Sequence, residues 1–133
     1  RCVNVLVFVD PVNQFNGPLM IVPGSHKEEY PVPVLDSSTT GYAGRWLAPK
    51  HFEDIVNNRG IVAPEGPAGS VIFAHTNIIH GSGPNMTPWR RGIISMTLNS
   101  IENIIGESSR PDFVVSRDLT PIVPLADDGL STE

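Results

Sequence analysis

The stretch GSVIFAHTNIIHGSGPNMTPWRRGIISMTLN, residues 69–99, decides the fold class of this chain. A β-rich apolar run at residues 70–74 is followed by the turn signal Gly-Ser-Gly-Pro-Asn at residues 81–85. Residues 91–99 then alternate between apolar and polar side chains, and a period of two places them on opposite faces of a strand. The stretch therefore predicts short strands joined by turns, with one face of residues 91–99 lining a cavity.

Upstream of this stretch, residues 2–9 and 19–22 are also β-rich. The turn signal Asn-Gly-Pro at residues 16–18 lies between them, so we expect a hairpin with a broad loop, and residues 2–9 as a central strand. Residues 28–44 are rich in Pro, Ser, Thr and Gly without periodicity, which predicts a long surface loop.

A single short helix is predicted downstream of that loop. Pro49 suits the first helical position, Phe52, Ile55 and Val56 share one face, and Gly60 lies just past the end. Many short strands with proline and glycine turns and one helix indicate a mainly β fold, either a β-sandwich or a double-sheet jelly roll.

Length and composition limit the classes of protein to consider. A chain of 133 residues suits one domain, and we expect residues 1–125 to form the C-terminal part of a single domain and residues 126–133 to be a tail. The chain opens without a methionine, inside an apolar run, so we interpret it as a piece of a longer domain. A lost N-terminal half would leave an exposed sheet edge, which makes a homodimer possible.

Charge, hydropathy and cysteine content indicate which partners and which location to expect. The net charge of −5 with scattered basic residues argues against a nucleic-acid partner. No stretch approaches the roughly 20 apolar residues that a membrane helix needs, so no membrane partner is expected. The single cysteine, Cys2, cannot form an internal disulfide and fits a cytoplasmic protein.

His80 and Arg91 are the candidate site residues, eleven positions apart across the predicted turn. If the turn joins neighbouring antiparallel strands, both side chains can face one cavity. A neutral imidazole binds first-row metals, and a guanidinium matches a carboxylate in two-point contact. The alternative is that His80 is a turn residue bonded to nearby backbone and that Arg91 is solvated.

Three motifs in order carry a resemblance to a known family: NGPLMIVPGSHK at residues 16–27, GIVAPEGPAGSV at residues 60–71, and the block from His80 to Arg91. Together they resemble the phytanoyl-CoA dioxygenase family, with ectoine hydroxylase-like members nearest, over residues 3–99.

The resemblance implies a partial double-stranded β-helix, which is a cupin-like jelly roll. It implies Fe(II) held by a His-X-Asp pair and a distal histidine, and 2-oxoglutarate chelating the iron with its far carboxylate on an arginine. His80 matches that histidine and Arg91 that arginine, while Thr87 and Ser95 could hydrogen-bond the 2-oxoglutarate carboxylates. The implied activity is that of a dioxygenase, an oxidoreductase that uses O2 to hydroxylate a small-molecule substrate.

The sequence departs from the family pattern in its metal ligands. No His-X-Asp occurs in it, and the nearest imitation, His51-Phe52-Glu53, falls on the surface of the predicted helix. Because a facial triad needs three protein donors, we expect the chain alone to bind iron weakly and to be inactive. The rival hypothesis is a non-catalytic jelly-roll module that binds a small ligand.

A second departure concerns the substrate. Ala74 and Ser95 stand where ectoine hydroxylases tend to carry aromatic side chains, so an ectoine-like compound, an amino acid or an acyl substrate are all open.

Two further histidines are assigned structural roles: His26 is expected to cap a turn, and His75 to pack or to face solvent.

Overall fold

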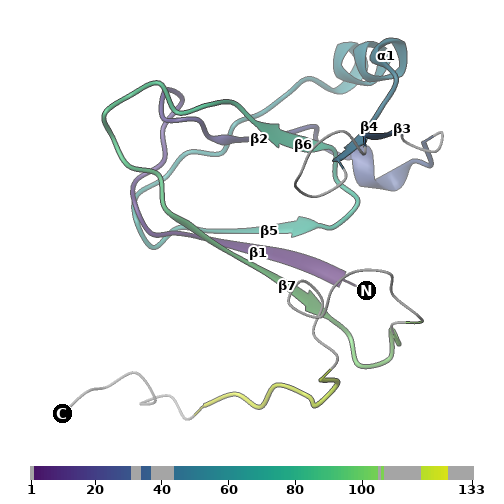
Figure 1. Cartoon of the computed structure of the whole chain (residues 1–133), viewed down its shortest axis with the longest axis vertical. Helices are drawn as coiled ribbons and strands as arrows, with labels where there is room; N and C mark the ends of the chain where they lie inside the picture. Colours follow the sequence, from purple (N-terminus) through teal and green to yellow (C-terminus); the bar gives the residue numbers. More distant parts are fainter. Residues whose placement is uncertain (1, 31–33, 37–43, 105, 107–117, 126–133) are drawn as a thin grey trace. The chain divides into compact units, whose positions relative to one another are not determined.

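The computed structural model describes residues 2–30, 34–36, 44–104, 106 and 118–125 (Figure 1). By its internal contacts the chain divides into a unit of residues 2–98 and a unit of residue 1 with residues 99–133. In the second unit Asn99 and Asn103 bond to each other, with Asn103 Nδ2 donating to Asn99 Oδ1 at 2.6 Å. The predicted tail at residues 126–133 lies outside the described residues, so the division at residue 125 stays a prediction.

A three-stranded sheet forms one layer of the first unit. Strand β1 (Cys2–Phe8) lies between β5 (Val71–His75) and β7 (Ile93–Asn99), which confirms the prediction that it is central (Figure 1). β1 and β5 are antiparallel, with Val3 opposite His75 and Val7 opposite Val71.

β7 also runs antiparallel to β1. Val9 N donates to Gly92 O at 2.9 Å at one end, and Thr97 Oγ1 donates to Asn4 Oδ1 at 2.8 Å at the other. Asn4, Thr97 and Ala74, which is opposite Asn4, therefore share one face of the sheet.

A two-stranded ribbon forms the second layer. β2 (Leu19–Ile21) pairs antiparallel with β6 (His80–Ser82), and Ile21 also bridges to Val62. The predicted hairpin between residues 2–9 and 19–22 is therefore wrong, because residues 9–18 carry the chain from the first layer to the second. The turn predicted at residues 81–85 is also partly wrong, since Gly81 and Ser82 pair with β2.

The predicted long loop at residues 28–44 contains regular structure. β3 (Val34–Asp36) pairs antiparallel with β4 (Gly44–Trp46), and residues 31–33 and 37–43 lie outside the described part. The expectation of an unstructured loop is wrong at these strands, because paired segments of three residues are too short to show a period of two. Upstream, Ser25–Lys27 forms the short 3₁₀ helix η1.

Helix α1 (Pro49–Arg59) confirms the predicted helix at both ends. Pro49 occupies the first turn, and Gly60 N donates to Val56 O at 2.7 Å while Gly60 has φ of 72°. Glycine enters this left-handed region without the steric cost that other residues carry. Of the predicted apolar face, Ile55 is buried. In the part of the chain that the structure describes, no helix combines the length and the hydropathy of a membrane span.

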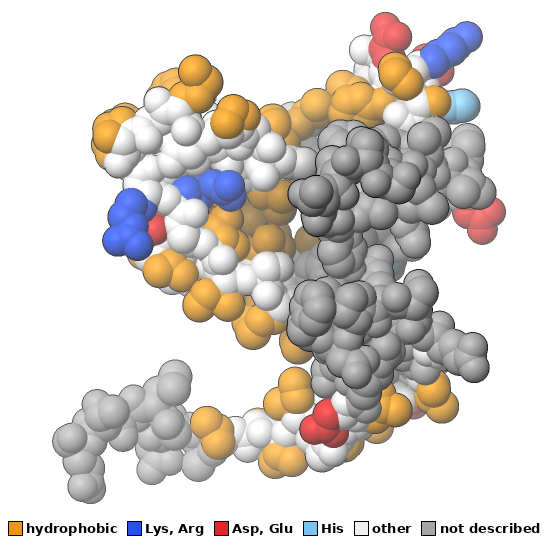
Figure 2. Space-filling model, viewed as in Figure 1, with side chains coloured by type: hydrophobic (Ala, Val, Ile, Leu, Met, Phe, Trp, Pro, Cys, Tyr) orange, Lys and Arg blue, Asp and Glu red, His pale blue; other side chains and the backbone are white. Residues whose placement is uncertain are grey.

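The buried apolar core is small, and its residues come from β1, β5, helix α1 and the segments on either side of β2. Its described members are Val5, Phe8, Val12, Val22, Ile55 and Ala74. Figure 2 shows a hollow between the three-stranded sheet and the β2–β6 ribbon, with hydrophobic side chains at its back and basic side chains at its rim. Hydrophobic burial therefore does not close the space between the two layers.

Asn16 is fully buried and fixes the connection between the two layers. Its Oδ1 accepts from Asn13 N at 2.9 Å, and its Nδ2 donates to Pro11 O at 3.0 Å and to Arg90 O at 3.2 Å. One amide thus ties the loop after β1 to the segment before β7. A buried polar group is retained in a fold when its bonds are satisfied in this way.

Replacing Asn16 by alanine should lower the free energy of unfolding by at least about 2 kcal/mol, since each buried polar group left unpaired costs about 1–3 kcal/mol. Urea denaturation of the protein measures this value. Gln14→Ala, two residues away and exposed, should change it by less than about 0.5 kcal/mol. Equal effects of the two substitutions would contradict the anchoring role of Asn16.

Candidate functional site

His80 is the first residue of β6, where it lies opposite Ile21, and its side chain is exposed. Its Nδ1 lies 2.8 Å from Ile78 O. A carbonyl oxygen can only accept, so Nδ1 carries the proton of the neutral imidazole and Nε2 keeps its lone pair. This is the tautomer that a histidine uses when it binds a metal through Nε2.

The turn after His80 packs against the motif at residues 16–27. Gly17, with φ of 74°, is so close to this turn that an added Cβ would lie 2.8 Å from Gly83 O and 3.1 Å from Asn85 N. Only glycine fits there, because both the backbone conformation and the contact exclude a side chain. The Asn-Gly-Pro segment therefore supports the turn that follows β6.

Arg91 lies two residues before β7, and its neighbours in the chain are held by partly buried hydrogen bonds. Asp10 Oδ2 accepts from Gly92 N at 2.7 Å, and Asn16 donates to Arg90 O. Arg91 Nε is buried and has no hydrogen-bond partner among the described residues. A buried guanidinium nitrogen without a partner is costly, and a carboxylate is the ligand that its planar fork fits.

The structure corrects the expected relation between the two site residues. β6 pairs with β2 and β7 pairs with β1, so His80 and Arg91 are not on adjacent antiparallel strands. The ten residues 83–92 between the strands form their own turn and span the two layers (Figure 1). The prediction failed because this connection is too long for a tight hairpin. That both side chains face one cavity stays a prediction.

Thr87 and Ser95, the predicted carboxylate contacts, are in different environments. Thr87 Oγ1 donates to Asn85 Oδ1 at 2.8 Å and accepts from Trp89 N at 3.2 Å, so its hydroxyl is engaged inside the turn. A bond to 2-oxoglutarate would require this hydroxyl to rotate. Ser95 is exposed on β7, two residues before Thr97 and therefore on the same face as Asn4.

Four polar residues near the site were not assigned roles from the sequence alone. Their contacts are long-range, so no local pattern marks them, and only the position of two of them in the motif at residues 16–27 is a signal. They are Asn4, Asp10, Asn16 and Ser25.

Two of the other histidines contact each other. The rings of His26 and His75 stack with centroids 5.1 Å apart and an interplanar angle of 23°, so His75 packs, as expected. In the described part of the chain, no three His, Cys, Asp or Glu side chains come together as a metal site.

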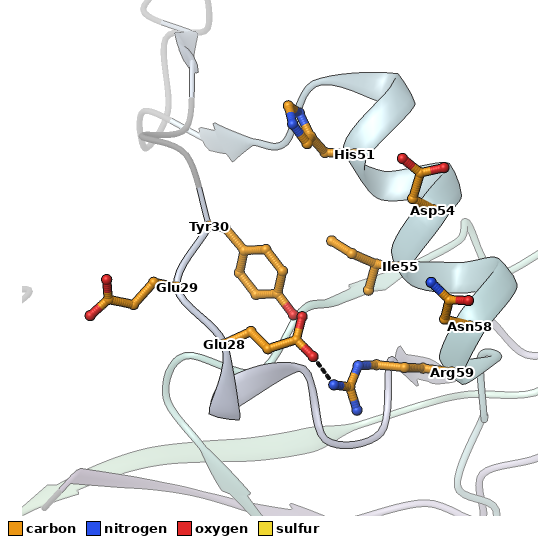
Figure 3. A pocket seen from close by; sticks show the side chains of 8 residues that line it. All are labelled: Glu28, Glu29, Tyr30, His51, Asp54, Ile55, Asn58 and Arg59. Carbon is orange, nitrogen blue, oxygen red and sulfur yellow. Dashed lines mark hydrogen bonds and ion pairs between the residues drawn. The ribbon is translucent and has the colours of Figure 1, made fainter.

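A pocket of about 520 Å³ lies between residues 28–30, which follow η1, and helix α1, and it includes neither His80 nor Arg91 (Figure 3). The ion pair between Glu28 and Arg59 crosses one side of it. His51 faces it from α1, which agrees with the interpretation that the His51-Phe52-Glu53 segment is surface. Its lining residues are Glu28, Glu29, Tyr30, His51, Asp54, Ile55, Asn58 and Arg59.

The sheet of three strands facing a two-stranded ribbon is part of a jelly roll, as predicted. Residues 1–93 match the phytanoyl-CoA dioxygenase (PhyH) family. The chain belongs to this family, which confirms the resemblance drawn from the three motifs.

Curated relatives support the same assignment. The chain is 33% identical to an L-proline trans-4-hydroxylase of Streptomyces griseoviridis, over 96% of this chain and 52% of that protein. It is also 33% identical to an ectoine dioxygenase of Bordetella parapertussis, over 88% of this chain and 42% of that one. The chain thus spans about half the length of these relatives.

Solved structures agree in fold. The crystal structure of EctD from S. alaskensis with bound Fe aligns with a TM-score of 0.73 at 27% identity, over 91% of this chain and 40% of that one. The same protein with 2-oxoglutarate and 5-hydroxyectoine aligns with a TM-score of 0.72 at 30% identity, over 88% and 39%.

Gly17→Ala should lower the free energy of unfolding by more than about 1 kcal/mol, because the left-handed conformation and the contact with Gly83 O both become strained. The matched control is Gly83→Ala, on the other side of this contact, where an added Cβ meets nothing within 4 Å. This control should stay within about 0.5 kcal/mol of the parent in thermal or urea unfolding. If the two variants were equally stable, the packing assigned to Gly17 would be refuted.

Proposed function

We propose that this chain supplies the distal iron-binding histidine, His80, and the 2-oxoglutarate-binding arginine, Arg91, of an Fe(II)/2-oxoglutarate-dependent dioxygenase that hydroxylates a small metabolite. The observation that carries the proposal is Arg91 Nε, which is buried and finds no partner within the described residues. A carboxylate of the co-substrate would satisfy it in two-point contact. Membership of the family supports the same activity, as do the names of the curated relatives, a hydroxylase and a dioxygenase.

The residues present fit the proposed metal and co-substrate. His80 offers Nε2 as a ligand, because its Nδ1 donates to Ile78 O. Arg91 orients the far carboxylate, and the contacts of Asp10 and Asn16 hold the backbone on either side of it. When bound, Fe(II) and 2-oxoglutarate supply, with O2, the oxidant for hydroxylation.

The substrate that we favour is a small polar metabolite, an amino acid or an ectoine-like compound, over an acyl chain. Asn4 and Thr97 bond to each other on the sheet face that also carries Ser95, so this face presents polar groups. Ala74, opposite Asn4 on the same face, is buried and has a small side chain. Polar groups of this kind bind a substrate that carries its own hydrogen-bonding groups.

Replacing Arg91 by alanine in the full enzyme should raise the 2-oxoglutarate concentration needed for half-maximal rate about 10- to 100-fold, since a hydrogen bond to a charged group contributes about 1.5–3 kcal/mol. Succinate formation against 2-oxoglutarate concentration measures it. Arg90→Ala, at the exposed neighbour, is the control and should leave that requirement unchanged. An unaltered requirement in Arg91→Ala would remove Arg91 from this role.

The 133 residues by themselves, given Fe(II), 2-oxoglutarate and O2, should form no succinate, because they contain no His-X-Asp pair to complete the three protein donors. In the full enzyme, His80→Ala should abolish turnover and lower the iron content. Turnover by the 133 residues would contradict the assignment of the ligands. Full iron content in His80→Ala would remove His80 from the metal site. A full enzyme that bound no iron at all would instead favour the rival, a module that binds a small ligand without metal chemistry.

A cytoplasmic location and a homodimer, both expected from the sequence, stay predictions of this proposal. The first rests on the single cysteine, Cys2, and the second on the exposed edge expected for the sheet.

A further inference from the structure

The turn at residues 22–25, which leads into η1, contacts the segment just before His80 through a fully buried serine. Ser25 has no exposed surface, and its Oγ accepts from Ile79 N at 2.8 Å. Val22 N donates to Ile79 O at 2.9 Å, so both backbone groups of Ile79 are bound by this turn. Ser25 N donates to Val22 O at 3.2 Å, which closes the turn on itself.

The bond from Ser25 reaches His80 through one peptide group. The N–H of Ile79 and the carbonyl of Ile78 belong to the same rigid, planar unit. Ser25 Oγ accepts from the N–H, and on the other side the carbonyl oxygen lies 2.8 Å from His80 Nδ1. Fixing the N–H end of a planar peptide also fixes the direction in which its carbonyl points.

We propose that Ser25 is a positioning residue that selects the tautomer and orientation of His80, through the peptide between Ile78 and Ile79, so that Nε2 presents its lone pair to the metal. The inference rests on the proposed function for the identity of the ligand at Nε2. The hydrogen-bond chain itself, from Ser25 Oγ to His80 Nδ1, does not depend on that function.

Two physical effects act in the same direction along this chain. The serine oxygen holds the peptide plane, so the Ile78 carbonyl stays where only a protonated Nδ1 can bond to it. A hydrogen bond to the N–H also polarises the peptide and makes its carbonyl a better acceptor. The His80 ring is exposed, and within the described part of the chain its one side-chain hydrogen bond is to Ile78 O.

The test reads the tautomer directly by ¹⁵N NMR of the histidine ring in the full protein, without metal, under alkaline conditions where imidazole is neutral. His80→Gln identifies the His80 signals by their loss. The parent should show the proton on Nδ1, and Ser25→Ala should move a large share of it to Nε2. Ser25→Cys keeps a side chain of similar size with a weaker acceptor, so it should give an intermediate shift.

A matched control separates the effect of the hydrogen-bond chain from Ser25 to His80 from a general loosening of the fold. Val12 is 3% exposed and bridges to Gly66, away from the Ser25 contact. Val12→Ala should destabilise the protein by creating a cavity and leave the His80 tautomer as in the parent. A parent proton on Nε2, no change in either Ser25 variant, or an equal change in Val12→Ala would overturn the proposal.

Fe(II) binding, measured without oxygen or 2-oxoglutarate, distinguishes failure of the positioning role of Ser25 from failure of the proposed function. In the full protein Ser25→Ala should weaken Fe(II) binding about 10- to 100-fold, as loss of an outer contact to a metal ligand usually does, and Val12→Ala should not. If the parent bound no Fe(II) while the Ser25 variants still changed the His80 tautomer, the proposed function would be refuted and the effect of Ser25 on His80 would be retained. If Fe(II) affinity in Ser25→Ala equalled that of the parent, the positioning role would be refuted.

Discussion

The buried amide of Asn16 is the contact on which the arrangement of the two layers depends. Its three hydrogen bonds fix the loop after β1 and join it to Arg90, just before β7. The described apolar core is small, so the loops cannot be held by hydrophobic burial alone. Hydrogen bonds depend on direction as well as distance, so a buried amide whose hydrogen bonds are all made fixes the positions of the backbone groups that it binds. It therefore sets the path by which the chain leaves one layer and enters the other.

The elements that local pattern could predict are those whose periodicity is complete within a few residues. β1, β5 and β7 were expected from β-rich or alternating runs, and α1 from Pro49 and Gly60. The family followed from three motifs in order, because their combination is far more specific than any one of them.

Pairing between distant strands could not be predicted, because it is not encoded in either strand alone. The turn signal between them predicts that β2 pairs with β1. In the structure β2 instead pairs with β6 and Val62, some 40 to 60 residues away in sequence. The same limit explains why His80 and Arg91 were expected on neighbouring strands: the turn between them is visible in the sequence, but the layer to which each strand belongs is not. Their candidate roles rested on residue chemistry, which needs no knowledge of pairing.

The motif at residues 16–27 contains no group proposed to touch iron or co-substrate, yet three of its residues contact the backbone near His80 or Arg91. Asn16 bonds to Arg90 O, Gly17 packs on the turn that follows His80, and Ser25 bonds to Ile79 N. Side chains on separate sheets can act together only if the backbones that carry them are fixed to a common element. This segment is that element, since it contacts the backbone beside both.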